Sequence, residues 1–239
     1  MTAEAPLGGR SVLVTGATRG IGRAVAERLA DEGARLHLLA RSADEVGRLA
    51  ERTGGRAWPC DLADDVDAWS VAESLQEVLG GPPDAVVNAA GAFDLAPLAD
   101  TSVARFDAVV AVNLRGPFLV MRALLPAMLR RGAGRIVNVG SVAGRRPLPG
   151  NAAYGASKYG LRGLHEVLVE EVRGTGVTAS LVEPSATDTS LWDELAPDER
   201  DDLPSRSAML DPADVAEVVL FVLTRPATVQ VPLVQIERG

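Results

Sequence analysis

Two residues of this sequence, Tyr154 and Lys158, have the types and the spacing of an acid–base pair. They are four positions apart in a segment that predicts a helix, so their side chains share one face of it. A phenol with a pKa of about 10 is a poor acid or base at neutral pH, whereas an adjacent ammonium favours the phenolate and lowers that pKa. The pair could therefore give or take a proton at a carbonyl oxygen.

The composition singles out the same lysine. The chain has 24 Lys and Arg residues, and all of them except Lys158 are Arg. This exception indicates a position where a compact ammonium is needed and a planar guanidinium does not serve, although a single lysine could also remain by chance. The tyrosine is not explained by abundance, because the chain has only two.

Two further polar residues could take part in the same chemistry. Ser141 follows a predicted strand, which places its hydroxyl at the carboxyl end of the sheet, within reach of the same carbonyl oxygen. Asn113 interrupts an apolar helical segment, where an amide needs hydrogen-bond partners. The alternative for Asn113 is that it only satisfies a backbone kinked near Pro117.

A glycine-rich turn, Thr15–Gly22, joins the first predicted strand to the first predicted helix. Its glycines have the spacing G-x-x-x-G-x-G. Glycines at such a turn let the backbone approach a pyrophosphate, whose charge is favoured at the helix N-terminus. In this position the pattern predicts a dinucleotide site.

The residues around the second predicted strand indicate which dinucleotide. A site for NAD needs an acidic residue here to hold the ribose hydroxyls. The strand instead ends in Ala40 followed by Arg41, and Arg19 lies in the glycine turn. Two guanidiniums and no carboxylate suit a 2′-phosphate, so NADP is favoured, unless both are solvated surface arginines. After the third strand, Asp61 and Leu62 could contact the adenine, or Asp61 could cap a helix.

The elements that position these residues alternate along the chain. Mostly continuous apolar runs predict strands at Ser11–Thr15, Arg35–Ala40, Arg56–Pro59, Ala85–Asn88, Arg135–Val139, Val177–Val182 and Val229–Ile236. Helical patterns lie between them at Ile21–Glu32, Asp44–Arg52, Asp65–Leu79, Val103–Arg131, Ala152–Arg173 and Ala213–Leu223. The alternation predicts an α/β fold: a doubly wound, Rossmann-like, mostly parallel seven-stranded sheet with helices on both faces.

The chain is expected to form one domain, residues 1–239, because it has 239 residues of which 47% are hydrophobic. The acidic, proline-containing segment Glu183–Leu210 leaves the carboxyl end of a strand and is too long for an ordinary connection, so we expect a lid over the site rather than a solvated loop. Three loops, Phe93–Ala99, Arg145–Gly150 and Thr189–Leu210, would shape the substrate pocket. An apolar wall is expected from Leu95, Leu148, Pro149, Leu191 and Trp192.

The composition disfavours several other classes of protein. A net charge of −8 disfavours a nucleic-acid partner, which requires a basic face. A single cysteine, Cys60, leaves no internal disulfide and no cysteine-based metal site. No apolar run approaches the ~18 residues of a membrane span, and the first residues lack a signal-peptide pattern. We therefore expect a cytoplasmic protein without a metal or a membrane partner.

Together these residues resemble the short-chain dehydrogenase/reductase family in its compact single-domain form, over nearly the whole chain. Thr15–Gly22 is similar to the family's TGxxxGxG cofactor motif, and Asn88–Gly91 to its NNAG motif, with Ala89 in place of the second Asn. Pro184–Thr189 resembles the PGxxxT segment that contacts the nicotinamide, with Ser185 in place of Gly. The catalytic tetrad is matched by Asn113, Ser141, Tyr154 and Lys158.

The resemblance implies an NADP(H)-dependent oxidoreductase that moves hydride between the nicotinamide and a ketone or aldehyde, giving a secondary alcohol or small hydroxy acid. It implies that Tyr154 is the acid/base, that Ser141 orients the carbonyl, that Lys158 holds the nicotinamide ribose and tunes Tyr154, and that Asn113 anchors a proton-relaying water. Family members are commonly homotetramers, or dimers, paired through the helices Val103–Arg131 and Ala152–Arg173. The implied cofactor contacts are Gly16, Thr18, Arg19, Gly20, Ile21, Gly22, Arg41, Asp61, Leu62, Asn88, Ala89, Gly91, Lys158, Pro184, Thr187 and Thr189.

Two alternatives to a reductase of small carbonyl compounds remain. A 3-oxoacyl-carrier-protein reductase would use Arg130, Arg131 and Arg173 to meet an acidic carrier protein. Such relatives usually end in a strand close to TGxxxxVDGG, which the final residues Gln230–Gly239 lack. A non-catalytic NADP-sensing regulator is the other alternative, and the intact tetrad argues against it.

Overall fold

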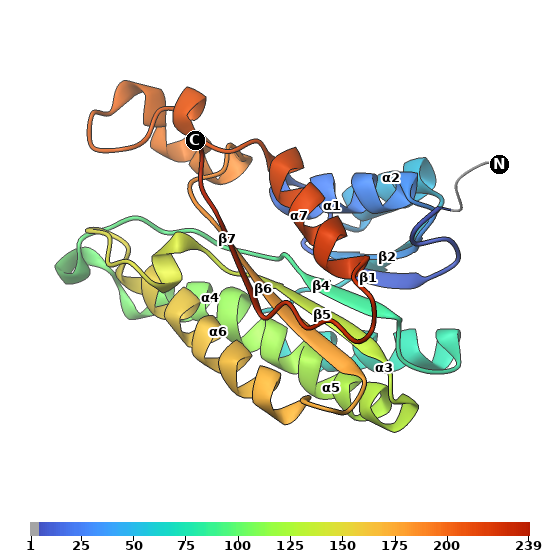
Figure 1. Cartoon of the computed structure of the whole chain (residues 1–239). Helices are drawn as coiled ribbons and strands as arrows, with labels where there is room; N and C mark the ends of the chain where they lie inside the picture. The colour runs from blue at the N-terminus through green and yellow to red at the C-terminus, as the bar shows by residue number, and fades with distance from the viewer. Residues whose placement is uncertain (1–4) are drawn as a thin grey trace.

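In the computed structural model, which describes residues 5–239, seven parallel strands form one sheet in the order β3-β2-β1-β4-β5-β6-β7 (Figure 1). The strands are β1 Ser11–Thr15, β2 Arg35–Ala40, β3 Arg56–Pro59, β4 Ala85–Asn88, β5 Gly134–Val139, β6 Val177–Pro184 and β7 Leu233–Ile236. The reversal of strand order between β1 and β4 is that of a doubly wound fold. The predicted α/β, Rossmann-like sheet is confirmed.

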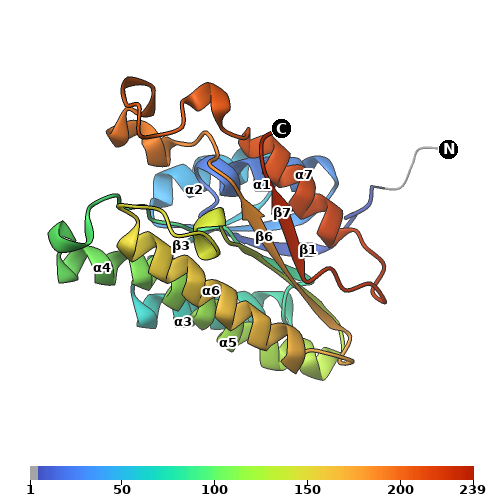
Figure 2. The ribbon, with the colours of Figure 1, turned by 60° about the vertical axis from the view of Figure 1, so that its left-hand side comes forward.

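Helices cover both faces of the sheet, as Figures 1 and 2 show: α1, α2 and α7 lie on one face and α3 to α6 on the other. Their bounds are α1 Gly20–Asp31, α2 Ala43–Thr53, α3 Asp65–Leu79, α4 Val103–Val110, α5 Gly116–Arg131, α6 Ala152–Glu171 and α7 Pro212–Leu223. Within β1, Val12 and Val14 pack into the core on the α1 and α7 side, whereas Leu13 packs into the core on the other side. Burial on both faces explains the continuous apolar runs of the sequence.

The long helix predicted at Val103–Arg131 is divided in two. A π-helical segment, Ala111–Arg115, separates α4 from α5. Pro117 has no N–H to donate to the carbonyl of Asn113 four residues earlier, which weakens the regular ladder at this point. The interruption therefore coincides with one of the predicted site residues.

The same segment corrects a second expectation. The continuous stretch Val103–Arg131 is long and apolar enough to cross a membrane by length and composition, so the statement that no run approaches a membrane span is wrong by this measure. Half of its most apolar window is buried inside the protein, as in a core helix. Leu124 and Met128 of α5, for example, pack in the core beneath the sheet.

Other boundaries differ by a few residues. β7 begins at Leu233 rather than Val229, because Pro232 has no N–H for a strand ladder. β6 continues to Pro184, so the predicted lid begins at residue 185 rather than 183. In Figures 1 and 2 this segment extends beyond the carboxyl end of the sheet, where it joins β6 to α7.

Candidate active site

A cavity of about 1720 Å³ lies at the carboxyl ends of the strands, where the glycine turn, the loops after β4 and β5 and the segment after β6 meet. Ligand pockets for a single small molecule are typically ~300–1,000 Å³, so this cavity has room for a dinucleotide and a substrate together. Its position is the usual one for ligands in doubly wound sheets.

The glycine turn is sterically suited to a pyrophosphate. Gly16 has φ +65°, and a Cβ there would lie 2.5 Å from the Cα of Ala90. The N-cap of α1 is Arg19, whose side chain gives no hydrogen bond to the first helical turn. The N–H groups of that turn therefore receive no side-chain cap, which leaves the helix N-terminus available to an anion.

The predicted cofactor residues line this cavity with two exceptions, Gly22 and Asn88. A Cβ on Gly22 would lie 2.2 Å from the carbonyl oxygen of Gly16, so the turn requires a residue without a side chain at this position. Asn88 is 2% exposed, and its Nδ2 donates a hydrogen bond of 2.8 Å to Oδ1 of Asn138 on the neighbouring strand. Both residues support the site and do not face a ligand.

The end of the cavity near β2 carries the two predicted arginines. Arg19 and Arg41 are exposed, and neither side chain bonds to any residue of 5–239. Asp61 also lines the cavity, with its Oδ1 accepting a hydrogen bond of 3.0 Å from the N–H of Ala63. The N-cap of α3 is Asp64, so the alternative of Asp61 as a helix cap is wrong.

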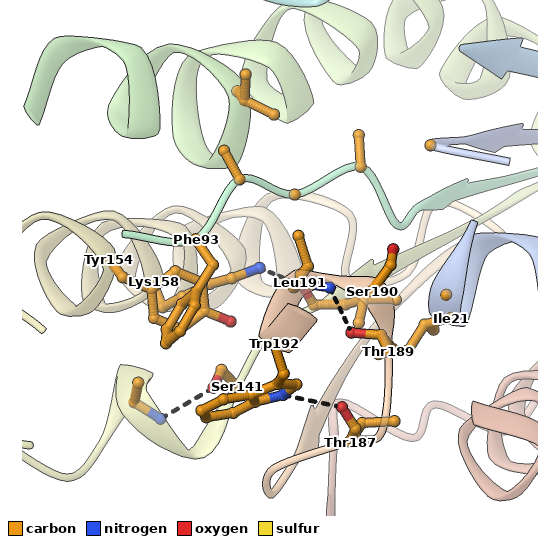
Figure 3. A pocket seen from close by; sticks show the side chains of 18 of the residues that line it. Ile21, Phe93, Ser141, Tyr154, Lys158, Thr187, Thr189, Ser190, Leu191 and Trp192 are labelled. Atoms are coloured by element: carbon orange, nitrogen blue, oxygen red, sulfur yellow. Dashed lines mark hydrogen bonds between the residues drawn. The ribbon is translucent and has the colours of Figure 1, made fainter. Parts of the chain in front are cut away.

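Tyr154, Ser141 and Lys158 meet at the other end of the cavity (Figure 3). Lys158 is 5% exposed; its Nζ donates a hydrogen bond of 2.9 Å to the carbonyl oxygen of Val139 and lies 5.7 Å from the centre of the Tyr154 ring. Ser141 accepts a hydrogen bond of 3.1 Å from the N–H of Ala143, which fixes its Oγ at the cavity wall. The arrangement puts two hydroxyl groups on one side of the space that a carbonyl would occupy.

The pKa values of the pair differ from the sequence-based expectation. Burial raises the pKa of Tyr154, and a hydrogen bond with Ser141 only partly opposes this. Burial lowers the pKa of Lys158 to about 8. The expected lowering of the Tyr154 pKa is therefore wrong for this structure, because burial of the phenol outweighs the interactions that favour the phenolate. At neutral pH the phenol remains protonated and can act as an acid.

Asn113 is fully buried and does not line the cavity. Its Oδ1 accepts from the N–H of Ala92 at 2.7 Å, and its Nδ2 donates to the Ala92 carbonyl at 2.8 Å and to Oγ of Ser157 at 3.0 Å. Ser157 in turn donates to the carbonyl oxygen of Tyr154 at 2.7 Å. Asn113 thus ties the loop after β4 to the turn of α6 that carries Tyr154 and Lys158. These partners lie outside the kinked segment around Pro117, so the amide does more than satisfy the local backbone.

The apolar wall is assembled around Tyr154. The Phe93 ring packs edge-on against the Tyr154 ring, with centres 4.8 Å apart and planes at 87°, and lies 5.1 Å from the Trp192 ring (Figure 3). Nε1 of Trp192 donates to the carbonyl oxygen of Thr187 at 3.1 Å, which holds the indole over the cavity. All five residues predicted for the wall line the cavity, and Leu95 and Leu148 are among them.

Sequence reasoning left some cavity residues unassigned. Phe93 was placed only within a loop, although an aromatic residue soon after a strand's carboxyl end is a usable signal. Glu45 lines the cavity near Arg41 on the first turn of α2. Cys60 also lines the cavity and is buried. Burial and the nearby Asp67 raise the pKa of its thiol to about 12, so the thiol stays protonated. Among residues 5–239, no cluster of His, Cys, Asp and Glu side chains is suited to a metal ion.

The segment predicted as a lid, residues 185–210, is anchored at its base. The N–H of Asp188 donates to the carbonyl of Leu210 at 2.9 Å, and the N–H of Leu210 donates to that of Ala186 at 2.9 Å. Arg206 forms ion pairs with Asp188 and Asp193, so part of the acidic charge is neutralised internally. Thr189 contacts the glycine turn, since a Cβ on Gly20 would lie 3.0 Å from its Cγ2. The segment therefore passes close to the glycine turn, where the pyrophosphate is predicted to bind.

Comparison with known proteins agrees with this geometry. A family model described as short chain dehydrogenase matches residues 10–200. The chain is 34% identical over 230 residues to D-threitol dehydrogenase of Mycolicibacterium smegmatis, covering 92% of this chain and 88% of that protein. A metagenomic short-chain oxidoreductase solved with NADP superposes with a TM-score of 0.82 at 34% identity, covering 97% of both chains. Serine dehydrogenase from Escherichia coli superposes with a TM-score of 0.83 at 28% identity, covering 95% of this chain and 97% of that one.

Proposed function

This chain belongs to the short-chain dehydrogenase family, and on that premise we propose that it is an NADP(H)-dependent carbonyl reductase and alcohol dehydrogenase. Its substrates would be a ketone or aldehyde in one direction and a secondary alcohol or small hydroxy acid in the other. The main observation behind this proposal is that Ser141 and Tyr154 line the same cavity as the glycine turn.

Each side chain has a role that follows from its contacts. When bound, the nicotinamide supplies or accepts the hydride. Ser141 donates a hydrogen bond to the carbonyl oxygen and orients it, and Tyr154 gives that oxygen its proton. The positive charge of Lys158 offsets the negative charge that remains on the phenol. In alcohol oxidation the proton moves the other way.

The preference for NADP is supported by charge. Arg19 and Arg41 are available to a 2′-phosphate, and β2 ends in Ala40 rather than in an acidic residue. Glu45 is the nearby carboxylate that could instead hold ribose hydroxyls. The relative solved with NADP favours the arginines as the determinant.

A carrier-protein-bound substrate has weaker support. Of the three arginines considered for such a contact, Arg131 donates to the carbonyls of Pro82, Pro83 and Ala133, and Arg173 pairs with Glu170. Only Arg130 is left without a side-chain partner within residues 5–239. The relatives act, by their names, on threitol and serine, which are small and free molecules.

The experiment is to follow nicotinamide absorbance while the protein is mixed with NADPH or NADH and a panel of ketones, aldehydes, hydroxy acids and polyols. We expect turnover with NADPH that Tyr154→Phe abolishes, because the variant loses the proton donor and keeps the ring. Binding of NADPH, measured by its fluorescence, should survive in Tyr154→Phe. Binding without turnover of any compound by the native protein would contradict a reductase and favour the cofactor-sensing alternative.

We also propose that the chain assembles as a homotetramer, or a dimer, through α4, α5 and α6. Large apolar side chains are exposed on these helices, including Phe106, Phe118, Tyr159 and Val167. Exposed apolar surface of this kind commonly marks an interface. Light scattering after size exclusion should give a multiple of the 25.0 kDa chain mass, and a monomer would contradict the proposal.

A further inference from the structure

Two adjacent arginines after β5 have different surroundings. The guanidinium of Arg145 donates to Glu237 at 2.5 Å and lies 3.5 Å from the carboxylate of Glu183, which is 1% exposed. Arg146 lines the cavity, is exposed, and makes no side-chain hydrogen bond or ion pair with residues 5–239. Arg145 is therefore part of the protein's internal structure, whereas the charge of Arg146 is available.

The backbone fixes Arg146 close to Ser141. The N–H of Gly144 donates to the carbonyl of Ser141 at 2.9 Å, and the N–H of Arg146 donates to that of Val142 at 3.0 Å. Leu148 and Pro149, from the same loop, also line the cavity, and the loop leads into the first turn of α6, which carries Tyr154. Arg146 thus belongs to the substrate end of the cavity, at the carboxyl end of β5.

Other charges that line the cavity are separate or already paired. Arg19, Arg41, Glu45 and Asp61 come from the segments that follow β1, β2 and β3, on the opposite half of the sheet. Arg200 pairs with Asp202 at 2.7 Å, whereas Lys158 donates to the carbonyl oxygen of Val139 and serves the acid–base chemistry at Tyr154. Among residues 5–239, Arg146 is therefore the cation at the substrate end whose charged group has no hydrogen-bond partner, and no carboxylate there lacks one.

Resting on the proposed function, we propose that the substrate is an oxo acid, or the corresponding hydroxy acid, whose carboxylate binds Arg146 while its carbonyl lies at Ser141 and Tyr154. A guanidinium presents paired N–H donors that match the two oxygens of a carboxylate. The apolar side chains of Phe93 and Leu148 would contact the short carbon chain between the two groups. Arg146 would then determine specificity without taking part in the proton transfer.

The test compares acetoacetate with methyl acetoacetate, which share a reducible ketone and differ in the negative charge. We expect the native enzyme to have the higher kcat/KM on acetoacetate. Arg146→Gln should lower that value about 10- to 100-fold, mainly through KM, because a charge-assisted contact is lost. The same variant should change kcat/KM on the ester by less than about 3-fold, and Arg146→Lys should be intermediate on the acid.

The matched control is Arg48→Gln. Arg48 is exposed on α2, has no side-chain partner within residues 5–239 and lies outside the cavity. This variant removes the same charge from the protein, so kcat/KM on both substrates should be unaffected. An equal loss on acid and ester in Arg146→Gln, or an equal loss on the acid in Arg48→Gln, would overturn the proposal.

Two further arms separate this proposal from the proposed function. If neutral ketones are reduced but acetoacetate is neither preferred nor dependent on Arg146, only the oxo-acid proposal fails. Reduction of acetoacetyl-CoA without reduction of acetoacetate would also overturn it, in favour of a carrier-bound substrate. Should no carbonyl be reduced, calorimetric binding of acetoacetate to the native protein and to Arg146→Gln still decides the role of Arg146. Thermal melting of each variant shows whether it has folded.

Discussion

Gly22 lies directly behind Gly16, so close that a Cβ on Gly22 would be 2.2 Å from the Gly16 carbonyl oxygen. No side chain makes such a contact without a shift of the backbone, and the shift would move the turn that approaches the pyrophosphate. The first glycine of the motif faces the cavity, and the third holds the first in place.

Gly22→Ala should therefore weaken NADPH binding by at least about tenfold and destabilise the protein by ~1–3 kcal/mol, the usual cost of overpacking. Fluorescence titration with NADPH and urea unfolding measure the two effects. Gly47→Ala is the matched control, because Gly47 lies within α2 and a Cβ there meets nothing within 4 Å. It should leave binding unchanged and stabilise the helix by up to ~1 kcal/mol. Native binding in Gly22→Ala would show that the turn tolerates the shift.

Arg41→Asp should shift the cofactor preference from NADPH towards NADH, because a phosphate contact is replaced by an acid suited to ribose hydroxyls. The ratio of kcat/KM for NADPH to that for NADH should fall about 10- to 100-fold. Arg48→Asp makes the same charge change on the exposed surface of α2, outside the cavity, and should leave the ratio unchanged. A native enzyme that already prefers NADH would show that Arg19 and Arg41 are only surface charges.

The fold could be predicted from the sequence because its signals are local. Apolar runs that alternate with helical patterns predict the seven strands. The burial of β1 and β2 follows from their own apolar residues, without information about residues distant in the sequence. Boundaries were least accurate where one residue changes the backbone. Pro232 shortens β7, and the segment around Asn113 and Pro117 breaks one predicted helix into two.

Most of the predicted site positions line one cavity, but the sequence does not show how each residue acts. Membership of a motif does not distinguish a residue that faces the ligand from one that supports it, as Gly22 and Asn88 show. The partners of Asn113 lie 21 and 44 residues away, so they depend on how the loop after β4 meets α6. The same holds for Lys158, whose contact with Val139 changes the electrostatic argument made from its spacing to Tyr154.

Residues 190–204 of the lid should exchange their amide hydrogens quickly in the free protein and more slowly when NADP⁺ and a ketone are bound together, a pair that cannot react. The reason is that the tip carries few hydrogen bonds to the rest of the protein, whereas ligands would order it. The amides of Asp188 and Leu210 are the internal control, since they are already hydrogen-bonded at the base. Equal exchange at the tip in both states would make this segment a fixed loop.

Lys158→Arg tests the mechanism most directly. If the lysine remained only by chance, the change should be harmless, since every other basic position of the chain is Arg. The buried ammonium instead bonds to Val139 beside the Tyr154 ring, where a longer, planar guanidinium does not fit the same point. A misplaced acid–base partner costs about a hundredfold in rate, so we expect turnover at least ~100-fold lower with an unchanged circular dichroism spectrum.

The pH profile gives a second measure of the same variant. The pKa of Lys158 is lowered to about 8, so in the native enzyme its charge is present below this pH and lost above it. The pKa of Tyr154 is raised, so the phenol remains a proton donor across this range. Carbonyl reduction should therefore decline as the pH rises through about 8. Arginine keeps its charge there, so the residual activity of Lys158→Arg should lack this decline and have its optimum at higher pH. A variant with near-native turnover and the native pH profile would contradict the role assigned to Lys158.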